Sequence, residues 1–461
     1  MKLVFLVDSV QFFRDLFRSP LLTHLLKQEG TELILASIFN PDVLRSEISH
    51  PRLKVVALRQ RKASLINRWL HSMARDVYTI EHPVGSFAQR RWTVAETNSS
   101  ETSLRWRLLL ARVWRVIGLN SQRLIRIGER FGSDPGFGKL LDDDRPDAVI
   151  YSYMIPAGFE CLKEARRRQI PLILMVASWD NPTSKGPLTV VPDYSIVWSE
   201  QMRDEMKEYH GLPPDRMEIA GVLYFENYFH PERLLGRGES CRDLGIPEDR
   251  KIIHFATGDS AIMNCNQEFI RILHRILESG QLSMPSHLLV RVSPKDKFEL
   301  YREFEGLPNL TVQYPSGRGE VYGGHKWIPD PGEELERAST IRNSDVILSV
   351  SSSMVLDASC FDVPTINLAY DAGMPAAKWE SVDRFYLYTH ALPVLEEEAT
   401  LVVKNDDELV AALKVALEKP ETKREERARL LRRLVQFTDG KTHERLAEAF
   451  ARLIARNRRS T

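Results

Sequence analysis

The chain of 461 residues alternates short apolar runs, rich in β-branched residues, with polar segments that favour helices. A first series of apolar runs comprises residues 3–8, 32–39, 147–154, 172–178, 194–199 and 218–223, and a second comprises residues 252–258, 287–293, 310–315, 345–350 and 365–370. Strands separated by helices in this way are typical of parallel sheets with crossover helices. The sequence therefore predicts an α/β fold of two consecutive doubly wound, Rossmann-like domains, which suits a chain of this length.

A polar stretch between the two series, residues 226–251, contains two prolines and three glycines and predicts the domain boundary. We expect an N-terminal domain over residues 1–228, with a basic helical insertion around 52–130, and a linker over 229–249. A C-terminal domain follows over 250–430. The last helices, residues 431–461, are expected to pack back on the N-terminal domain.

Composition narrows the class of protein. The 63 basic and 63 acidic residues give no net charge, which argues against a dedicated nucleic-acid binder. The four cysteines are far apart and form no CxxC pair, which excludes a disulfide scaffold and a structural zinc site. No run approaches the ~20 apolar residues that span a bilayer, and the apolar start is too short for a secretory signal. We therefore expect a cytoplasmic protein.

The neutral total hides a strongly basic region. Residues 52–130 contain sixteen lysines and arginines against five acidic residues, and residues 104–131 repeat apolar and arginine positions at helical spacing. One interpretation is a core helix whose arginines are solvated. The other is a surface for an anionic lipid or an anionic acceptor, which would place the protein at the inner face of the cell membrane.

In open parallel sheets, ligands bind beyond the carboxyl ends of the strands, and two such domains are expected to face each other across a cleft. Residues 345–350 predict a buried strand, Ser351, Ser352 and Ser353 a turn, and Met354 the start of a helix. Small residues at such a turn leave backbone N–H groups free for an anion. Asp357, one helical turn later, is placed to reach a sugar hydroxyl. The structural alternative is serine N-capping of the helix.

Two further elements of the second domain fit a phosphate site. Thr257 and Gly258 follow its first strand, where glycine permits close approach of a phosphate. Arg291 and Lys295 flank the end of another strand and would offset charge on a departing diphosphate. The alternatives are an ordinary Gly-Asp turn and a solvated Lys295.

This block resembles the glycosyltransferases of the two-domain GT-B fold. In that family a W-x-P segment lies by the nucleotide base, a small-residue turn holds the diphosphate, an acidic residue binds ribose, and a later aspartate contacts the donor sugar. The resemblance assigns these places to Trp327 and Pro329, to the serine turn, to Asp357, and to Pro364 and Asp371. Serine replaces the family's usual glycines, aspartate replaces its glutamate, and no H-x-G precedes them. These departures leave the identity of the donor nucleotide open.

The first domain carries the distinctive segment SWDNPTSKG, residues 178–186, directly after an apolar run. With Trp198 and Glu200, and then His210, Gly211 and Pro213, it resembles a motif of bacterial GT-B-like proteins. We predict Asp180 as a catalytic or acceptor-orienting residue, Asp8 as a second candidate for that role, and Arg291 as their partner in catalysis. The acceptor-binding residues predicted around Asp180 are Trp179, Asn181 and Lys185. An Asx turn that ends the strand is the structural alternative for Asp180.

No metal site is predicted. Asp142 to Asp144 resemble the DxD motif of another glycosyltransferase fold, but they precede a strand and are expected in a solvated loop at the amino edge of the sheet. The histidines show no metal-ligand spacing, and neither a P-loop nor a GxGxxG follows a first strand. Metal-bound, ATP-hydrolysing and dinucleotide redox chemistry therefore lose support.

The resemblance implies a metal-independent glycosyltransferase without a cofactor, whose nucleotide-sugar donor is a co-substrate and whose acceptor is a glycan or a lipid-linked sugar. If the reaction inverts, Asp180 would be the general base; if it retains, Arg291 and Lys295 matter more. The alternatives are a polyol-phosphate transferase of the CDP-glycerol type, a UDP-sugar 2-epimerase, and an inactive nucleotide- or glycan-binding module. We expect no nucleic-acid partner.

Overall fold

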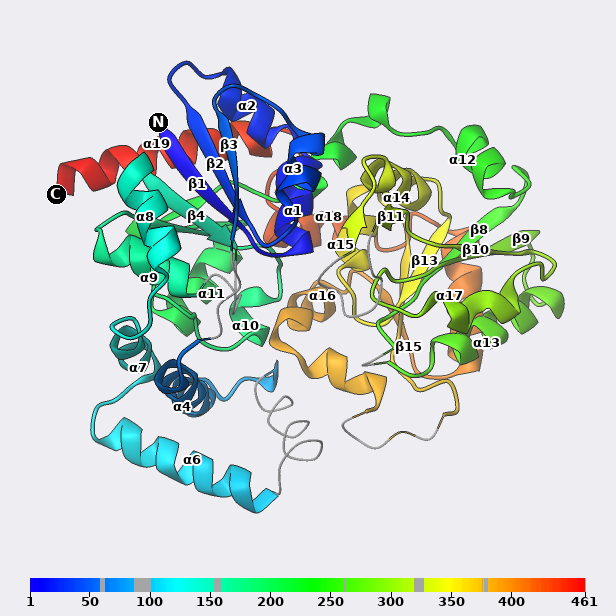
Figure 1. Ribbon diagram of the computed structural model, residues 1–461. Coiled ribbons are helices and arrows are strands. Elements are labelled where there is room, and N and C mark those ends of the chain that lie inside the picture. Colours follow the sequence, from blue (N-terminus) through cyan, green and yellow to red (C-terminus); the bar gives the residue numbers. More distant parts are fainter. Residues whose placement is uncertain are drawn as a thin grey trace. The chain divides into compact units, whose positions relative to one another are not determined.

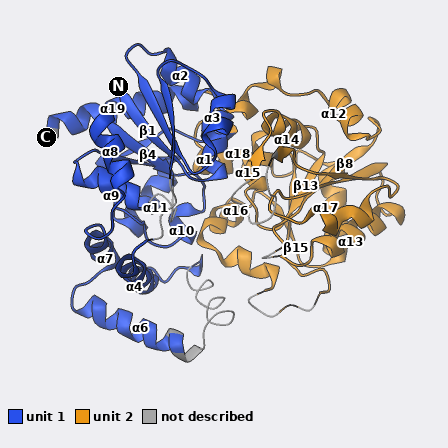
Figure 2. Cartoon of the chain, in the orientation of Figure 1, with its two compact units in different colours: residues 1–224, 441–461 blue, residues 225–440 orange. Residues whose placement is uncertain are grey.

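The fold was examined in a computed structural model that describes residues 1–58, 63–86, 101–152, 159–260, 263–318, 327–374, 376 and 380–460 (Figure 1). These residues form two compact units, residues 1–224 with 441–461 and residues 225–440 (Figure 2). Each unit is built on a parallel sheet flanked by helices. The predicted pair of doubly wound α/β domains is confirmed.

The first unit contains a seven-stranded sheet of order β3-β2-β1-β4-β5-β6-β7, in which every neighbouring pair is parallel. Its strands are β1 (Lys2–Val7), β2 (Glu32–Ser37), β3 (Leu53–Ala57), β4 (Ala148–Ser152), β5 (Leu172–Met175), β6 (Tyr194–Val197) and β7 (Met217–Ile219). Its helices are α1 (Val10–Phe17), α2 (Leu21–Lys27), α3 (Pro41–Glu47), α4 (Leu65–Glu81), α6 (Glu101–Val116), α7 (Ser121–Gly128), α8 (Pro135–Asp144), α9 (Phe159–Arg167), α10 (Asn181–Ser184), α11 (Glu200–His210) and α19 (Thr442–Ser460). The strand order reverses between β1 and β4.

The C-terminal residues 441–461 belong to the first unit, because α19 completes its core. The ring of Phe450 on α19 meets the ring of Phe5 on β1 edge to face, with the centroids 5.9 Å apart, and both side chains are fully buried. Aromatic pairs of this geometry add about 0.5–1.5 kcal/mol beyond the area that they bury. The preceding helix, α18 (Arg424–Leu434), lies in the second unit.

The second unit contains a six-stranded parallel sheet of order β10-β9-β8-β13-β14-β15 and a small antiparallel pair, β11 with β12. The strands are β8 (Lys251–Ala256), β9 (Ser286–Arg291), β10 (Leu310–Gln313), β11 (Gly317–Arg318), β12 (Ile328–Pro329), β13 (Val346–Ser349), β14 (Thr365–Leu368) and β15 (Leu401–Val403). The helices, besides α18, are α12 (Arg237–Leu244), α13 (Asn266–Glu278), α14 (Glu333–Arg342), α15 (Met354–Cys360), α16 (Leu392–Glu396) and α17 (Asp406–Glu418). Here the strand order reverses between β8 and β13.

The apolar runs of the sequence predict the central strands and miss one edge strand in each sheet, β3 and β15. No residue of β3 is fully buried, and β15 has three residues with one of them exposed. An edge strand pairs on one side only and is covered less completely, so its sequence carries a weaker apolar signal.

The segment 229–249, expected to be a linker, is an integral part of the second unit. It contains α12, whose Cys241 packs in a buried cluster with Ile252 of β8 and Leu289 of β9. Arg237 at the start of α12 forms an ion pair of 2.9 Å with Asp345. The polar composition reflects a helix that buries a narrow face, because its other residues face solvent.

The basic region forms helices, but the single helix expected over residues 104–131 is interrupted. Gly118 adopts a left-handed φ of 82°, and Asn120 caps α7 by accepting a hydrogen bond from the N–H of Arg123 at 2.8 Å. The helices α6 and α7 therefore lie on either side of a turn at residues 117–120. Residues 87–100 of the basic region are outside the described residues.

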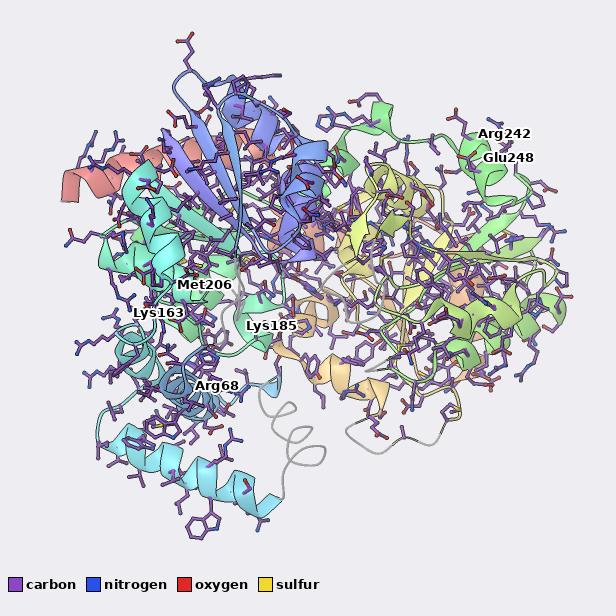
Figure 3. The ribbon with its side chains drawn as sticks, in the orientation of Figure 1. Arg68, Lys163, Lys185, Met206, Arg242 and Glu248 are labelled. Carbon is purple, nitrogen blue, oxygen red and sulfur yellow. The ribbon has the colours of Figure 1, made fainter. Side chains whose placement is uncertain are left out.

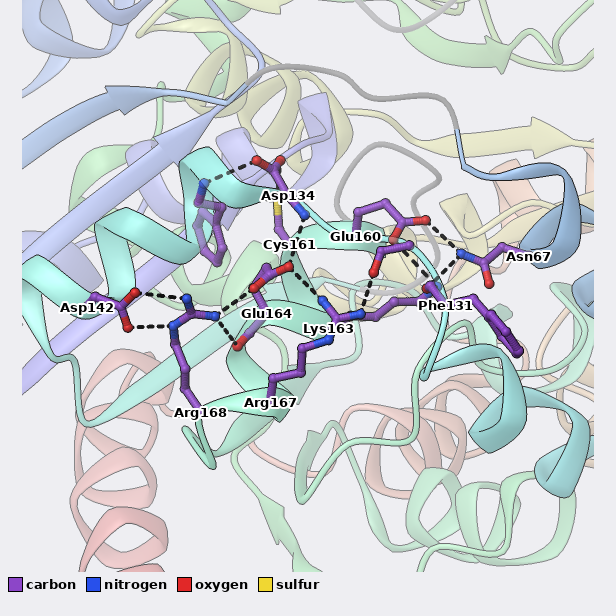
Figure 4. Close-up of polar contacts among 12 residues, drawn as sticks. Asn67, Phe131, Asp134, Asp142, Glu160, Cys161, Lys163, Glu164, Arg167 and Arg168 are labelled. Carbon is purple, nitrogen blue, oxygen red and sulfur yellow. Dashed lines mark hydrogen bonds and ion pairs between the residues drawn. The ribbon is translucent and has the colours of Figure 1, made fainter.

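A buried polar network holds α9 against its neighbours in the first unit (Figure 4). Lys163 Nζ donates to the carbonyl of Phe131 at 2.7 Å and lies 3.6 Å from Glu160, and Glu160 also accepts from Asn67 of α4 at 2.8 Å. Burial lowers the pKa of Lys163 to about 8. Because these groups compensate each other, the network is structural: it ties α9 to α4 and to the chain before α8.

Candidate functional site

Five of the predicted donor residues, in two turns, lie at the point where the strand order of the second unit reverses. The adjacent strands β8 and β13 run parallel, with Phe255 beside Leu348 in register. The turn of Thr257 and Gly258 follows β8, and the turn of Ser351 to Ser353 follows β13. Two small-residue turns thus leave neighbouring strands at one edge, the place where ligands of open α/β sheets bind.

The serine turn has a fixed backbone. Ser351 adopts a left-handed φ of 28°, and its N–H donates to the hydroxyl of Tyr386 at 3.3 Å. The hydroxyl of Ser352 accepts from the N–H of Met354 at 3.3 Å, whereas Ser353 is exposed and its side chain makes no capping hydrogen bond. The strand, turn and helix expected here are confirmed, and the anion-binding role of the turn stays a prediction.

The turn after β8 is equally ordered. The side-chain amide of Asn266 brackets Gly258 with two hydrogen bonds of 3.0 Å, one to its N–H and one to its carbonyl. A Cβ atom on Gly258 would lie 2.7 Å from Met263 Sδ, so a side chain there forces a shift. Thr257 Oγ1 accepts from the N–H of Ser293 at 2.9 Å, which links the turn to the chain after β9. Sequence reasoning missed Asn266, because its signal is a lone asparagine eight residues away.

Arg291 is the last residue of β9 and is buried, with 7% of its surface exposed. Its guanidinium pairs with Glu333 and has Nη1 4.0 Å from Glu336. Burial raises the pKa of Glu333, and the Arg291 charge opposes that shift. The charge of Arg291 is therefore partly compensated in this structure. Lys295, four residues later, is exposed.

Asp357 is fully buried on α15. Its Oδ1 accepts a hydrogen bond of 2.6 Å from the hydroxyl of Tyr228 and lies 3.8 Å from Arg337. The Tyr228 ring stacks on Phe361 with the centroids 5.0 Å apart. Burial and then the charge of Asp357 raise the pKa of Tyr228. The carboxylate is thus engaged inside the unit, and its ribose-binding role stays a prediction.

The remaining residues of the predicted donor site are also held by their surroundings. Asp371 follows β14 and accepts from Ser381 Oγ at 2.6 Å and from the N–H of Val382 at 2.8 Å. Trp327 is buried immediately before β12, and Pro329 pairs with Gly317 across that short ribbon. These contacts order the loop after β14 and the W-x-P segment, and the roles predicted for both toward a ligand stay predictions.

In the first unit, Asp8 lies at the carboxyl edge of the sheet, in the position that the two small-residue turns occupy in the second unit. It follows β1 directly, at the point where the strand order reverses, and only 6% of its surface is exposed. Among the described residues, its Oδ1 has no hydrogen-bond partner. Burial raises the pKa of Asp8 well above its ordinary value, and a hydrogen bond from its own backbone opposes that shift less strongly. A buried carboxyl of this kind suits proton transfer near neutral pH.

Asp180 has a different environment, after β5. Its Oδ2 accepts from Ser184 Oγ at 2.7 Å and lies 3.1 Å from Lys185 Nζ. Asn181 Oδ1 accepts from the N–H of Ser178 at 3.0 Å, and Trp179 is buried. The carboxylate therefore sits at the start of the short helix α10 and stabilises it. The catalytic role of Asp180 and the acceptor roles of its neighbours stay predictions.

The other residues of the first-unit motif hold this edge together. Trp198 Nε1 donates to the carbonyl of Val176 at 2.8 Å, and His210 Nε2 contacts the carbonyl of Pro182 at 2.9 Å. Burial lowers the pKa of His210 to about 4, so the ring is neutral at physiological pH. Gly211 ends α11 with a left-handed φ of 62°. In this structure, the motif is a scaffold for the loop that contains Asp180.

Asp142 to Asp144 form the last turn of α8 rather than a loop. Asp142 pairs with Arg168 at 2.7 Å and Asp144 with Lys54 at 2.6 Å. The part of the chain that the structure describes holds no group of three or more histidine, cysteine, aspartate or glutamate side chains arranged for a metal ion.

No protein-family profile and no curated protein sequence matches the chain. Solved structures match it over almost its full length. The UDP-GlcNAc 2-epimerase of Neisseria meningitidis bound to UDP-GlcNAc has a TM-score of 0.55 at 11% identity, and the match covers 98% of this chain and all of that one. A putative UDP-N-acetylglucosamine 2-epimerase of Listeria monocytogenes has a TM-score of 0.57 at 13% identity and matches over 97% of this chain and 95% of its own. A glycosyltransferase of Rickettsia africae has a TM-score of 0.50 at 10% identity, with 98% of each chain covered.

Sequence identities this low show a shared fold and no finer similarity. The shared fold includes both units, since each match covers the chain almost from end to end. Together with the two parallel sheets, this likeness confirms the GT-B architecture predicted from the sequence.

Proposed function

We propose that this protein is an enzyme that acts on a nucleoside-diphosphate sugar, and that its reaction is the 2-epimerisation of a UDP-sugar. The observation that carries the proposal is the pair of ordered small-residue turns where β8 and β13 end, in a fold shared end to end with a 2-epimerase bound to UDP-GlcNAc. Of the functions that the sequence left open, this one has the stronger support from the structural matches.

In this proposal the second unit binds the nucleotide. Backbone N–H groups of the turns at Gly258 and at Ser351 to Ser353 contact the diphosphate, and Arg291 turns from Glu333 toward the charge that develops on it. An arginine is suited to this task because its guanidinium offers a fork of donors to phosphate oxygens. The chemistry proposed here needs no metal ion or other cofactor.

The first unit supplies the proton-transferring group, and Asp8 is the better-supported candidate. In the first step a base removes the proton from C2, the electron pair of the C2–H bond forms a C1=C2 double bond, and the C1–O bond breaks with its electron pair leaving on the diphosphate. In the second step an acid on the opposite face donates a proton to C2, and a diphosphate oxygen forms the bond to C1 again. Asp8 is buried with a raised pKa, whereas Asp180 is already bound by Ser184 and Lys185.

Glycosyl transfer is the second candidate, and a specific observation favours it. The order W-x-P, serine turn, Asp357 and Asp371 resembles GT-B transferases, and a glycosyltransferase is among the structural matches. Transfer begins with the same break of the C1–O bond but needs an acceptor, a glycan or a lipid-linked sugar, near Trp179, Asn181 and Lys185.

Nucleotide binding can be tested by thermal unfolding with UDP, GDP, CDP and their sugar conjugates. A ligand at a hundred times its Kd stabilises the folded state by about 2.7 kcal/mol, and Ser352→Ala should reduce that shift while the exposed Ser283→Ala in the same unit leaves it unchanged. A shift with CDP-glycerol alone would favour polyol-phosphate transfer. The absence of any shift would overturn the proposal.

The reaction can be tested by incubating the UDP-sugar alone in D₂O. Epimerisation replaces the hydrogen at C2 with deuterium and yields the C2 epimer without an acceptor, which proton NMR detects. A transferase leaves C2 untouched and consumes donor only when an acceptor is added. Binding without either reaction would point to a nucleotide-binding module.

A further inference from the structure

An unusual apolar surface lies on α4 and α6, at the periphery of the first unit (Figure 1). Large apolar side chains that are normally covered are exposed here, to 75% at Leu65, 63% at Trp106 and 86% at Val116. The set comprises Leu65, Ile66, Trp69, Trp106, Leu109, Leu110, Val113, Val116 and Ile117. Exposed apolar patches in a folded unit mark interaction sites.

On α6 these side chains form one stripe. From Trp106 to Ile117 they follow each other in steps of one or three residues, which keeps them on one side of a helix. Ala111 is buried against Leu70 and Leu124, and its spacing from Trp106 and Val113 places it on the opposite side. The helix therefore packs on the unit with one face and presents a second apolar face outward.

The charged side chains described as exposed on these helices are all arginines. Arg68 and Arg75 on α4 and Arg105, Arg112 and Arg115 on α6 are all exposed, and Figure 3 labels Arg68.

The acidic side chains described on the same helices are already engaged. Asp76 is paired with Arg107 at 2.7 Å, and Glu81 accepts from Ser121 Oγ at 2.5 Å. The exposed surface therefore combines an apolar stripe, two tryptophans and several exposed arginines.

We propose that α4 and α6 form a docking surface for the anionic headgroups of a lipid bilayer, into which the α6 stripe inserts. Arginines that pair with lipid phosphates, beside apolar and tryptophan side chains at the headgroup level, are the features of helices that lie in a membrane interface. Among the described residues no helix is long and apolar enough to cross a bilayer, so the contact is peripheral. This proposal does not depend on the reaction proposed above.

Charge argues against two other occupants. A second copy of the chain would bring the same arginines toward one another in an isologous interface, and none of the acidic side chains described on α4 and α6 is exposed to receive them. A nucleic acid would use the arginines but would leave most of the outward apolar stripe in water. An anionic bilayer offers phosphates to the arginines and an apolar interior to the stripe on α6.

The test is flotation of the full chain with vesicles of phosphatidylcholine alone or mixed with phosphatidylglycerol. We expect binding to the anionic vesicles only, weakened by salt. Arg112→Glu with Arg115→Glu should lower the affinity by at least fivefold per arginine. Val113→Ser with Val116→Ser should lower it as well, because both side chains insert.

Matched variants lie on the second unit: Arg242→Glu at an exposed arginine of α12 (Figure 3) and Leu387→Ser at a side chain that is 59% exposed. Both should bind like the unchanged chain, and all variants should keep its melting temperature, since each alters an exposed side chain.

Equal binding to uncharged vesicles, or equal loss in the second-unit variants, would overturn the proposal. A dimer that Val113→Ser with Val116→Ser dissolves, without vesicle binding, would assign the stripe to a second copy. RNA binding lost only in the arginine variants, again without vesicle binding, would assign it to a polyanion.

Discussion

The two units place a buried carboxyl group close to where their strand order reverses, but the groups that surround the two carboxyls differ. Asp357 in the second unit receives a hydrogen bond of 2.6 Å from Tyr228 and has Arg337 at 3.8 Å. For Asp8 in the first unit, Oδ1 has no hydrogen-bond partner among the described residues, and burial raises the pKa of the group. A compensated carboxylate stabilises its surroundings, whereas an uncompensated one costs stability and is available for chemistry.

The same contrast extends to the loops around the two groups. In the second unit, the turn after β8 is bracketed by Asn266 and the serine turn by Tyr386. Such ordered turns suit the binding of a fixed group like a diphosphate, since little conformational entropy is lost on binding. The contrast agrees with the proposed function, in which the second unit binds the nucleotide and the first transfers the proton, and variants that reverse either role would contradict it.

The largest effect is expected from Asp8→Asn. Loss of a general base costs about 10²–10⁴-fold in rate, and asparagine keeps the shape while it cannot accept the proton. The kcat of UDP-sugar turnover should fall by this factor while UDP still raises the melting temperature. Asp180→Asn is the matched control in the same unit and should cost less, because Asp180 is held by Ser184 and Lys185. A greater loss in Asp180→Asn would reverse the roles of the two residues.

The next largest effect is on folding. Asp357→Ala should lower the free energy of unfolding by about 1–3 kcal/mol, because it leaves the buried Tyr228 hydroxyl without its acceptor, while Arg337 keeps its ion pair with Glu334 at 2.7 Å. Urea unfolding measures this loss. Asp8→Asn should not destabilise the protein at neutral pH, since it removes a carboxyl group whose charged form is disfavoured by burial. Equal losses in the two variants would contradict the comparison.

The central strands and the strand-turn-helix at the serine turn were predictable, because apolar runs and small polar residues act locally. The edge strands β3 and β15 were missed, since a strand covered on one side carries a weak signal. The break between α6 and α7 was also missed, although Gly118 and Asn120 are recognisable turn and cap residues.

Partners distant in sequence could not be predicted from spacing. Tyr228 and Asp357 are 129 residues apart, and Arg291 and Glu333 are 42 apart, yet these pairs decide how each charge behaves. The sequence identified Asp8, Asp357 and Arg291 as candidates because their types and positions suit a sheet edge. Whether each is compensated depends on the tertiary fold.

A smaller effect is expected at the turn after β8. Gly258→Ala places a Cβ atom 2.7 Å from Met263 Sδ, and overpacking of this kind costs about 1–3 kcal/mol, here near the lower end because the thioether can move. The variant should also bind UDP more weakly, as measured by calorimetry. Gly332→Ala in the same unit has no atom within 4 Å and should change neither quantity. Unchanged UDP affinity in Gly258→Ala would remove this turn from the proposed site.

The smallest expected effect is the dependence of the free energy of unfolding on pH. Because burial raises the pKa of Asp8 above that of the unfolded chain, the folded state keeps this proton after the unfolded state has lost it. The stabilisation from Asp8 is therefore complete below about pH 4 and declines as the pH rises toward the folded pKa, by at most about 1.4 kcal/mol per pH unit for one proton. Asp8→Asn cannot ionise, so its free energy of unfolding should lack this decline. Urea unfolding of both proteins across this range measures the difference. A difference that grows toward acid pH would mean that the carboxylate of Asp8 is compensated after all, as that of Asp357 is.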